Sequence, residues 1–147
     1  MTDFERIEQL ADKLGHSMSN IRCRAAHNLL SKVQSGIIPH RLLSTPHCAE
    51  VIATGITKCV KLLCHDFSSS DRDESSCSTR NETLSLLLQF IKYVGSSSVA
   101  SSSLAFERYS EVLDGLYSIS SCEDQISDAV MIAIEQVALI IYSVIWL

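Results

Sequence analysis

Residues that interrupt helices are scarce in this sequence. Among its 147 residues there are two prolines and five glycines, and aromatic residues make up only 6%. Because few residues interrupt helices, long helices can form. Because few residues are aromatic, aliphatic side chains must fill the core. No stretch alternates polar and apolar residues for long enough to predict a strand. The chain is therefore expected to be all-α, and its length fits one domain over residues 1–147.

Charge is also sparse. Charged residues make up 20% of the chain and the formal net charge is −5. Domains that bind a nucleic-acid backbone usually carry a strong basic excess, so nucleic acid is not an expected partner. Between Lys13 and His65 there are seven lysines and arginines but one acid, Glu50, so the remainder is acidic. Such asymmetry either steers partners and neighbouring copies or is an ordinary solvated surface, and we favour the solvated surface.

Motifs of catalysis are missing. The sequence has no G-x-S-x-G and no phosphate-binding glycine loop. Five potential zinc ligands cluster in the sequence, but Cys59 and Cys64 are five residues apart on one predicted helix, whereas structural zinc sites use closer pairs at turns. The other three members of the cluster are His47, Cys48 and His65. The sequence therefore predicts no enzyme, no metal site and no cofactor.

The cysteines indicate a cellular compartment. The chain has six of them, but its start, MTDFERIEQL, is charged and amphipathic and does not resemble a signal peptide. Four lie in apolar helical patterns, where a buried thiol behaves as a small hydrophobe; these are Cys23, Cys48, Cys59 and Cys64. Most of the six are expected to be free thiols, which indicates the cytosol or the nucleus.

Apolar residues recur at helical spacing in six to seven segments. Their expected bounds are 3–14, 19–34, a short turn at 40–43, 46–65, 79–95, 104–117, and a last helix that begins near 121–124. Thr2 with Glu5 predicts a capping box at the first start, and Gly15 is expected to end that helix in the left-handed conformation. A second capping box is predicted at Thr79 and Glu82.

Two serine-rich segments, near 67–78 and 96–103, are predicted to be flexible loops because they cannot offset their ordering entropy by burial. Successive helices with wide apolar stripes pack either as a bundle or as the stacked pairs of an α-solenoid. The second helix favours the solenoid. Its "IR..AA..LL..V" pattern from Ile21 to Val33 is the spacing of the inner helix in armadillo and HEAT units. The predicted fold is therefore an armadillo/HEAT-like helical repeat.

One stretch, KLGHSMSNIRCRAAHNLLSKV at 13–33, resembles the amino-terminal domain of the rotatin family, whose members are long armadillo-like proteins of centrioles. The match is carried by Leu14-Gly15-His16, Ile21-Arg22 and the Ala25…Leu29…Lys32 spacing. A second stretch, NETLSLLLQFIKY at 81–93, resembles the next helix of that family, so the resemblance covers most of residues 7–94. It implies a non-catalytic scaffold in centriole assembly and maturation and in basal bodies and cilia. The implied location is the cytoplasm and cytoskeleton, at the centrosome, with other centriolar proteins as partners.

Two other functions remain open. One is a generic armadillo or HEAT adaptor in trafficking or nuclear transport, and the second is a homo-oligomerising helical bundle. The candidate protein-binding residues form a basic strip that would accept an acidic or amphipathic helix of a partner; they are Arg22, Arg24, His27, Lys32 and Arg41. Arg22 has a second interpretation, since an arginine at this place usually pairs with an acid of an adjacent helix or bonds carbonyl groups at a loop.

The last segment, AVMIAIEQVALIIYSVIWL at 129–147, is apolar nearly all round. A membrane span is not favoured, because Glu135 and Gln136 interrupt the run and no basic flank follows. A central buried helix is a second interpretation. We favour a third interpretation, in which this helix contacts the next repeats of its own chain. Solenoid ends normally carry a polar capping face, and this segment has none. If this helix stays uncovered, the chain is expected to form a homodimer through Tyr142, Ile145 and Trp146.

Overall fold

The computed structural model describes residues 2–43, 45–68, 74–96, 109–122 and 126–145. These ranges contain helices and no strand, so the prediction of an all-α protein is confirmed for them. The helices are α1 (Asp3–Leu14), α2 (Ser19–Gln34), α3 (His40–Leu43), α4 (Pro46–Ser68), α5 (Glu74–Ser96), α6 (Ser110–Ser120) and α7 (Asp128–Ile145).

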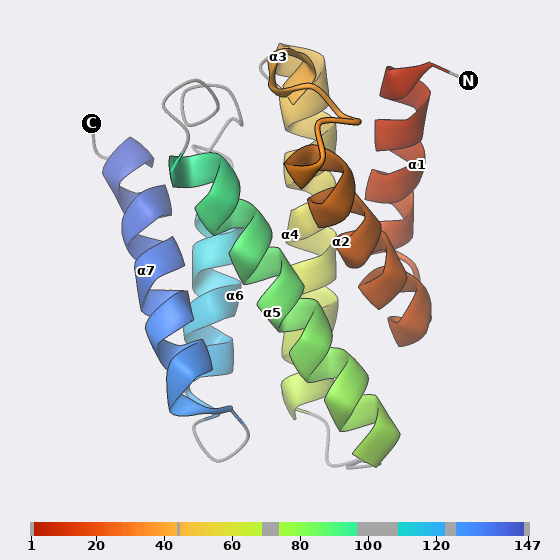
Figure 1. Ribbon diagram of the computed structural model, residues 1–147. Helices are drawn as coiled ribbons and strands as arrows, with labels where there is room; N and C mark the ends of the chain where they lie inside the picture. Colours follow the sequence, from red (N-terminus) through yellow and green to blue (C-terminus); the bar gives the residue numbers. More distant parts are fainter. Residues whose placement is uncertain (1, 44, 69–73, 97–108, 123–125, 146–147) are drawn as a thin grey trace.

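The long helices form three pairs that lie side by side in two layers. α1 packs on α2, α4 on α5, and α6 on α7. In one layer α4 lies between α1 and α6, and in the other α5 lies between α2 and α7. Figure 1 shows the α2, α5 and α7 layer in front of the α1, α4 and α6 layer. Each pair therefore packs mainly against the pair that precedes or follows it.

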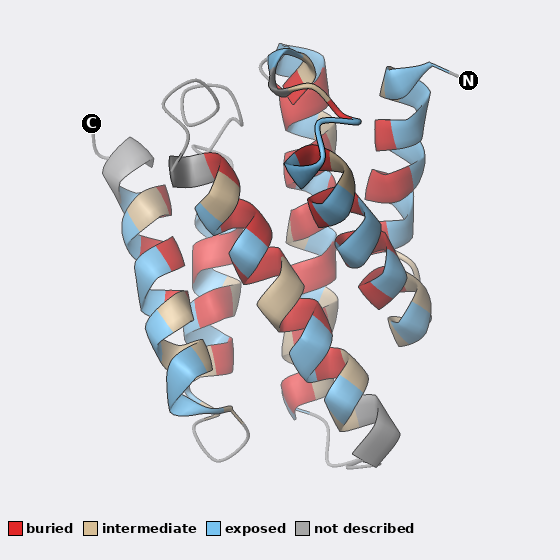
Figure 2. Cartoon of the chain, in the orientation of Figure 1, coloured by how far each residue is buried: buried red, intermediate tan, exposed pale blue. Residues whose placement is uncertain are grey.

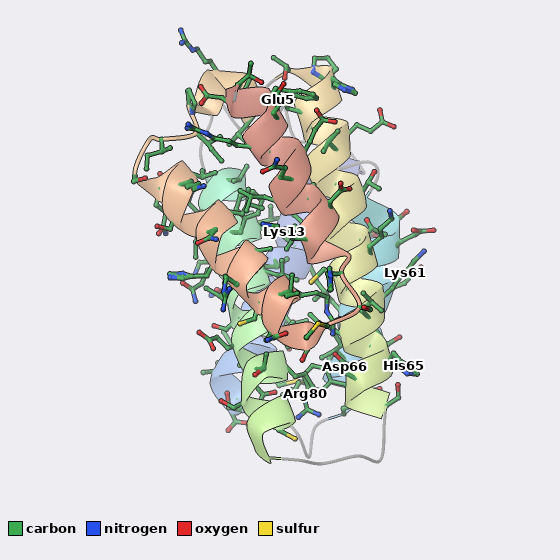
Figure 3. The ribbon with its side chains drawn as sticks, turned by 90° about the vertical axis from the view of Figure 1, so that its right-hand side faces the viewer. Glu5, Lys13, Lys61, His65, Asp66 and Arg80 are labelled. Atoms are coloured by element: carbon green, nitrogen blue, oxygen red, sulfur yellow. The ribbon has the colours of Figure 1, made fainter. Side chains whose placement is uncertain are left out.

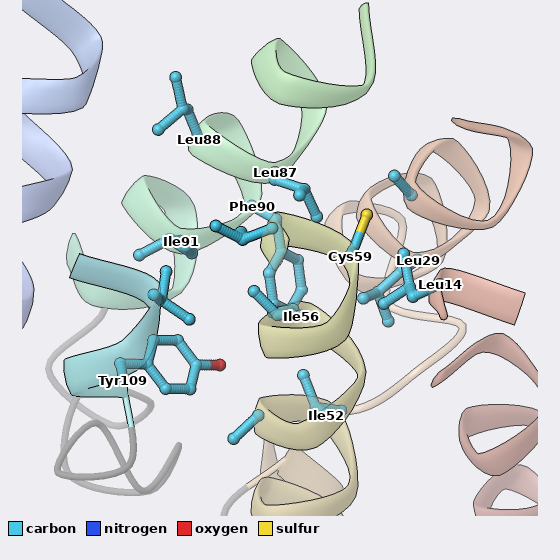
Figure 4. Close-up of a cluster of buried hydrophobic side chains, with 14 of the residues drawn as sticks. Leu14, Leu29, Ile52, Ile56, Cys59, Leu87, Leu88, Phe90, Ile91 and Tyr109 are labelled. Atoms are coloured by element: carbon cyan, nitrogen blue, oxygen red, sulfur yellow. The ribbon is translucent and has the colours of Figure 1, made fainter. Parts of the chain in front are cut away.

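Helix α4 is the centre of the core, since it packs against α1, α5 and α6. Its residues Ile52, Ile56, Cys59 and Leu63 follow each other at steps of three and four and are 1% exposed or less. Figure 4 shows Ile52, Ile56 and Cys59 among apolar side chains of neighbouring helices, with Tyr109 on the α6 side. Buried residues line the space between the helices (Figure 2). Each buried leucine or isoleucine contributes about 1.5–3 kcal/mol, so aliphatic packing carries the stability.

Small residues let the helices of one layer approach closely. A Cβ added to Gly55 of α4 would lie 2.9 Å from the carbonyl oxygen of Ala11 in α1. Gly115 of α6 lies in the same way against the side chain of Val60 in α4. Both glycines are therefore required by contact between helices, although each lowers the intrinsic helix propensity of its own element.

The start of α1 has the predicted capping box. The Thr2 hydroxyl accepts a hydrogen bond from the Glu5 N–H, the Glu5 carboxylate accepts one from the Thr2 N–H, and both are 3.1 Å long. The end of α1 differs from the prediction, because Gly15 has a φ of −94° and is not left-handed. Gly15 is instead placed where an added Cβ would lie 3.1 Å from Cδ of Lys58.

The first serine-rich loop is shorter than predicted. α4 continues to Ser68 and α5 already begins at Glu74, so residues 74–78 are helical, while 69–73 lie outside the described residues. Thr79 is consequently inside α5, and the capping box predicted there is wrong. The early turns of α5 are supported by the Arg80 guanidinium, which lies 4.1 Å from the ring centroid of Phe67, a contact that composition does not reveal.

The last helix begins later than predicted. α7 starts at Asp128, because the Ser127 hydroxyl accepts the N–H of Val130 at 3.3 Å and so caps the helix there. α6 starts at Ser110, and the residues 104–108 of its predicted range lie outside the described residues. The second serine-rich loop also lies outside them, apart from Ser96, which ends α5.

Candidate protein-binding surfaces

Most of the predicted basic strip lies on the surface. Arg24 and His27 of α2 are exposed, Lys32 of the same helix is half-buried, and Arg41 of α3 is exposed. Arg24 and Lys32 are separated by eight residues, so they lie on neighbouring parts of one side of α2, about 12 Å apart along its axis. The sequence from Lys13 to Ala49 contains no acidic residue, so the charged side chains of α2 itself are all basic.

Arg22 does not belong to that surface. Its side chain is only 3% exposed, because it shares the buried side of α2 with Ala25, Ala26 and Leu29. Its Nη2 donates to Oδ2 of Asp66 in α4 at 2.7 Å. The inclusion of Arg22 in a surface strip is therefore wrong, and its second interpretation is confirmed: it pairs with an acid of another helix and bonds carbonyl groups at a loop.

Those carbonyl groups belong to the connection between α1 and α2. Nη1 of Arg22 donates to the oxygen of His16 at 2.8 Å and to that of Ser17 at 3.0 Å. The imidazole of His16 takes part in the same connection, since its Nδ1 accepts the Met18 N–H at 3.0 Å. One guanidinium thus fixes the turn that joins the first pair and ties it to α4.

A second buried arginine lies at the same end of the molecule. Figure 3 shows Arg80 of α5 close to Asp66 of α4 in that view. Arg80 is 6% exposed and covers the Phe67 ring, while the neighbouring Thr83 is 1% exposed and donates to the Thr79 carbonyl at 2.8 Å. Sequence reasoning missed Arg80. The one signal for its burial is helical spacing, since Arg80 and Thr83 continue the row of buried apolar residues of α5 at steps of three and four.

The buried and half-buried thiols near this end are expected to be unreactive. Burial raises the pKa of Cys59 to about 12, despite the opposing charge of Arg22. Burial likewise raises the pKa of Cys23 and of Cys64. The Cys64 thiol donates to the Gly115 carbonyl at 3.2 Å and so joins α4 to α6. A thiol with a raised pKa is protonated at neutral pH and is a poor nucleophile.

The outer edge of the first pair is polar and carries cations. Arg6, Gln9 and Lys13 of α1 follow at steps of three and four and are exposed. Figure 3 views the molecule from this edge, with Lys13 labelled on α1. Of the four acids of this helix, Glu8 and Asp12 line a groove on its α4 side, Glu5 caps the helix start, and Asp3 pairs with Arg6 at 3.6 Å. The exposed cations of α1 thus lie on the same helical pair as the exposed Arg24 of α2.

The outer edge of the last pair is apolar. A groove of about 490 Å³ lies between α6 and α7 and is lined by Tyr117, Ser120, Met131, Ile134, Glu135, Ala138, Leu139 and Tyr142. Three large side chains on this edge are more than half exposed: Leu139 at 69%, Tyr117 at 57% and Tyr142 at 52%. Leu139 was missed because its segment is apolar on every side, so periodicity could not select the outward residues.

The three contact residues predicted in the last segment have different outcomes. Tyr142 is exposed and lines the groove. Ile145 is the last residue of α7, and its side chain is not among those described. Trp146 lies outside the described residues. The structure therefore places one of the three on the apolar edge and leaves the other two as predictions.

Metal and membrane sites are not apparent in the described part of the chain. No three His, Cys, Asp or Glu side chains there are arranged to hold a metal ion. None of the helices, as far as they are described, has the length and apolarity to cross a membrane. The features that stand out are therefore the basic edge at α1 and α2 and the apolar, acidic edge at α6 and α7.

Comparisons with known proteins do not add a family to this description. No protein-family model matches the chain, and neither the curated proteins nor the solved structures contain a significant match.

Proposed function

We propose that this chain is a non-catalytic, protein-binding scaffold domain whose helical pairs are armadillo- or HEAT-like repeats. The observation that carries the proposal is the stacking of three pairs in two layers, each pair packing mainly on its neighbours. That is the organisation expected of a solenoid, in which the exposed sides of successive helices make an extended surface for partners. The raised pKa values of the buried thiols also favour packing over nucleophilic chemistry for these cysteines.

The cellular role that we propose is in centriole assembly and maturation and in basal-body organisation, as the resemblance to the rotatin family implies. The residues that carry the resemblance are also those that build the first pair. Gly15 and His16 form the turn after α1, and Arg22 bonds the His16 carbonyl and Asp66. A family-wide need for this clamped turn would explain why those residues stand together.

The proposed binding site is the basic strip without Arg22, that is Arg24, His27, Lys32 and Arg41. Its charge fits an acidic or amphipathic helix of another centriolar protein, since opposite charges steer the encounter and an exposed helix side offers a row of donors. Arg24 is exposed, so its replacement should have little effect on folding.

A quantitative pull-down from a centrosome-enriched fraction tests this proposal. The bait is the full chain, either unchanged or with Arg24→Glu and Lys32→Glu. A matched control carries Lys58→Glu and Lys61→Glu, which alter the net charge equally on the exposed α4 surface. We expect centriolar proteins with the unchanged chain and the control, and a loss of about tenfold with the strip variant. Equal recovery with all three baits would refute the strip, and recovery of no centriolar protein would refute the proposed role.

A further inference from the structure

The two edges of the stack are complementary in charge. Residues 109–147 contain six acids and no lysine, arginine or histidine. Two of these acids, Asp128 and Glu135, are exposed on α7, and Glu135 also lines the groove against α6. At the other edge, α2 carries exposed Arg24 and no acid, and α1 adds exposed Lys13. One edge of the molecule thus carries the charge that would neutralise the other.

The spacing of the charges also agrees. Asp128 and Glu135 are seven residues apart, which places them about 10 Å apart along α7. Arg24 and Lys32 are about 12 Å apart along α2, by the same rise per residue. Two acids on one helix can therefore face two cations on the other when the helices lie alongside each other. Side chains of this length cover the remaining difference.

Apolar surface fits the same arrangement. Ile132 and Leu139 alternate with the two acids along the outer side of α7 and are 55% and 69% exposed. The α2 edge supplies Met18 just before the helix and Ile37 after it, both more than half exposed. The aliphatic stems of arginine and lysine can also cover apolar groups while their charged ends stay at an acid. The α2 edge is thus complementary to the α6–α7 edge in charge, and both edges carry exposed apolar side chains that association would bury.

We propose that the groove between α6 and α7 binds the α1–α2 edge of a second copy of this chain, so that copies associate head to tail. The two surfaces in such a contact are different. An assembly of copies therefore has a free α1–α2 edge at one end and a free α6–α7 edge at the other. The association therefore adds further copies and does not close as a dimer. Within one chain, each helical pair packs on the pair before it. In the proposed association, the first pair of one copy packs on the last pair of another copy in the same way.

The proposal does not depend on a centriolar role, and the purified full chain tests it alone. Sedimentation velocity over a range of protein concentrations should show an average mass that rises beyond two copies and falls at high salt, which screens exposed charge pairs. A chain that stays monomeric throughout would overturn the inference and would leave the pull-down result standing.

Two edge variants separate head-to-tail contact from its alternatives. The tail variant is Leu139→Arg, which places a cation opposite the cations of α2, and the head variant combines Arg24→Glu with Lys32→Glu. Each alone should be monomeric, with association weakened by about tenfold or more. Mixed together, they should form a 1:1 dimer, because the head variant has an intact tail and the tail variant has an intact head. A symmetric α7–α7 contact predicts the opposite: the head variant alone would dimerise and mixing would restore nothing.

A charge control and a folding control accompany the two edge variants. Thr54→Arg adds the same charge at an exposed position of α4 and should leave association unchanged. Circular dichroism verifies that each variant keeps its helices. If Leu139→Arg does not fold, Glu135→Lys replaces it, since Glu135 is exposed and its reversal should remove association equally. Loss of association in the Thr54→Arg control, or its persistence in both edge variants, would overturn the proposal.

Discussion

Arg22 and Asp66 join two helices from different pairs, with Nη2 of Arg22 2.7 Å from Oδ2 of Asp66. Asp66 is 33% exposed while Arg22 is 3% exposed, so the arginine has the larger desolvation cost to offset. It does so with three hydrogen bonds, of which two go to carbonyl groups of the α1–α2 connection. The pair therefore fixes the geometry of the turn as well as the contact between α2 and α4.

Replacement of Arg22 by methionine should lower the free energy of unfolding by about 3 kcal/mol. The methionine fills much of the same space, but the Asp66 carboxylate and two carbonyl groups lose their donor. Urea unfolding monitored by circular dichroism measures the change. Arg24→Met on the exposed side of the same helix is the control and should stay within about 0.5 kcal/mol of the unchanged chain. Equal effects of the two substitutions would contradict the role given to Arg22.

The contact between Gly55 and Ala11 leads to a second expectation. Gly55→Ala should destabilise the fold by about 1–3 kcal/mol, because the new Cβ would meet the Ala11 carbonyl and force α1 away from α4. The gain in helix propensity, about 1 kcal/mol, acts in the opposite direction but is smaller than a forced separation of two helices. Thr54→Ala, one residue earlier and exposed, is the control and should be neutral or stabilising. A stabilising Gly55→Ala would show that the helices are not in close contact.

Stability should fall in alkaline solution. Burial raises the pKa of Cys59 from 9.0 to about 12, so above pH 9 the folded chain keeps a proton that the unfolded chain releases. This contribution is fully present below pH 9 and is lost as the pH rises toward 12, with a slope of at most about 1.4 kcal/mol per pH unit for one group. Burial also raises the pKa of Tyr109, which adds to the slope above pH 10.

Unfolding curves in urea at several pH values between 8 and 11 measure that slope. Cys59→Ala should make it shallower and leave in place the contributions of Tyr109, Cys23 and Cys64, whose pKa values burial also raises. Since slopes are compared, the packing lost with the sulfur does not affect the reading. An unchanged slope in the variant would mean that Cys59 is not protected from water in the folded state.

The sequence was a good guide where one local rule applied. Helical spacing predicted α1, α2 and α3 with their observed bounds, and the Thr2 capping box depends on residues three apart. It failed where a tertiary contact decides. The start of α5 gains support from Arg80 over Phe67, and Gly15 is explained by its distance from Lys58, neither of which periodicity can reveal.

The candidate surfaces divide in the same way. The helical period of α2 already places Arg22 with Ala25 and Leu29 and so indicates its burial, although charge alone assigned it to the strip. Leu139 could not be selected, because the segment around it is apolar on all sides and only the neighbouring helices α5 and α6 define which side is covered. In such a helix, the packing of neighbouring helices determines which side chains are exposed, and the local sequence does not.

The location of the tagged full chain in cells is the most direct test of the scaffold account, with the Arg24→Glu, Lys32→Glu variant and the Lys58→Glu, Lys61→Glu control beside it. The account predicts that the unchanged chain and the control coincide with a centriole marker, and that the strip variant, at equal abundance, becomes diffuse. A diffuse or differently placed unchanged chain would contradict the centriolar role. A strip variant that stays at centrioles would contradict binding through the α2 surface.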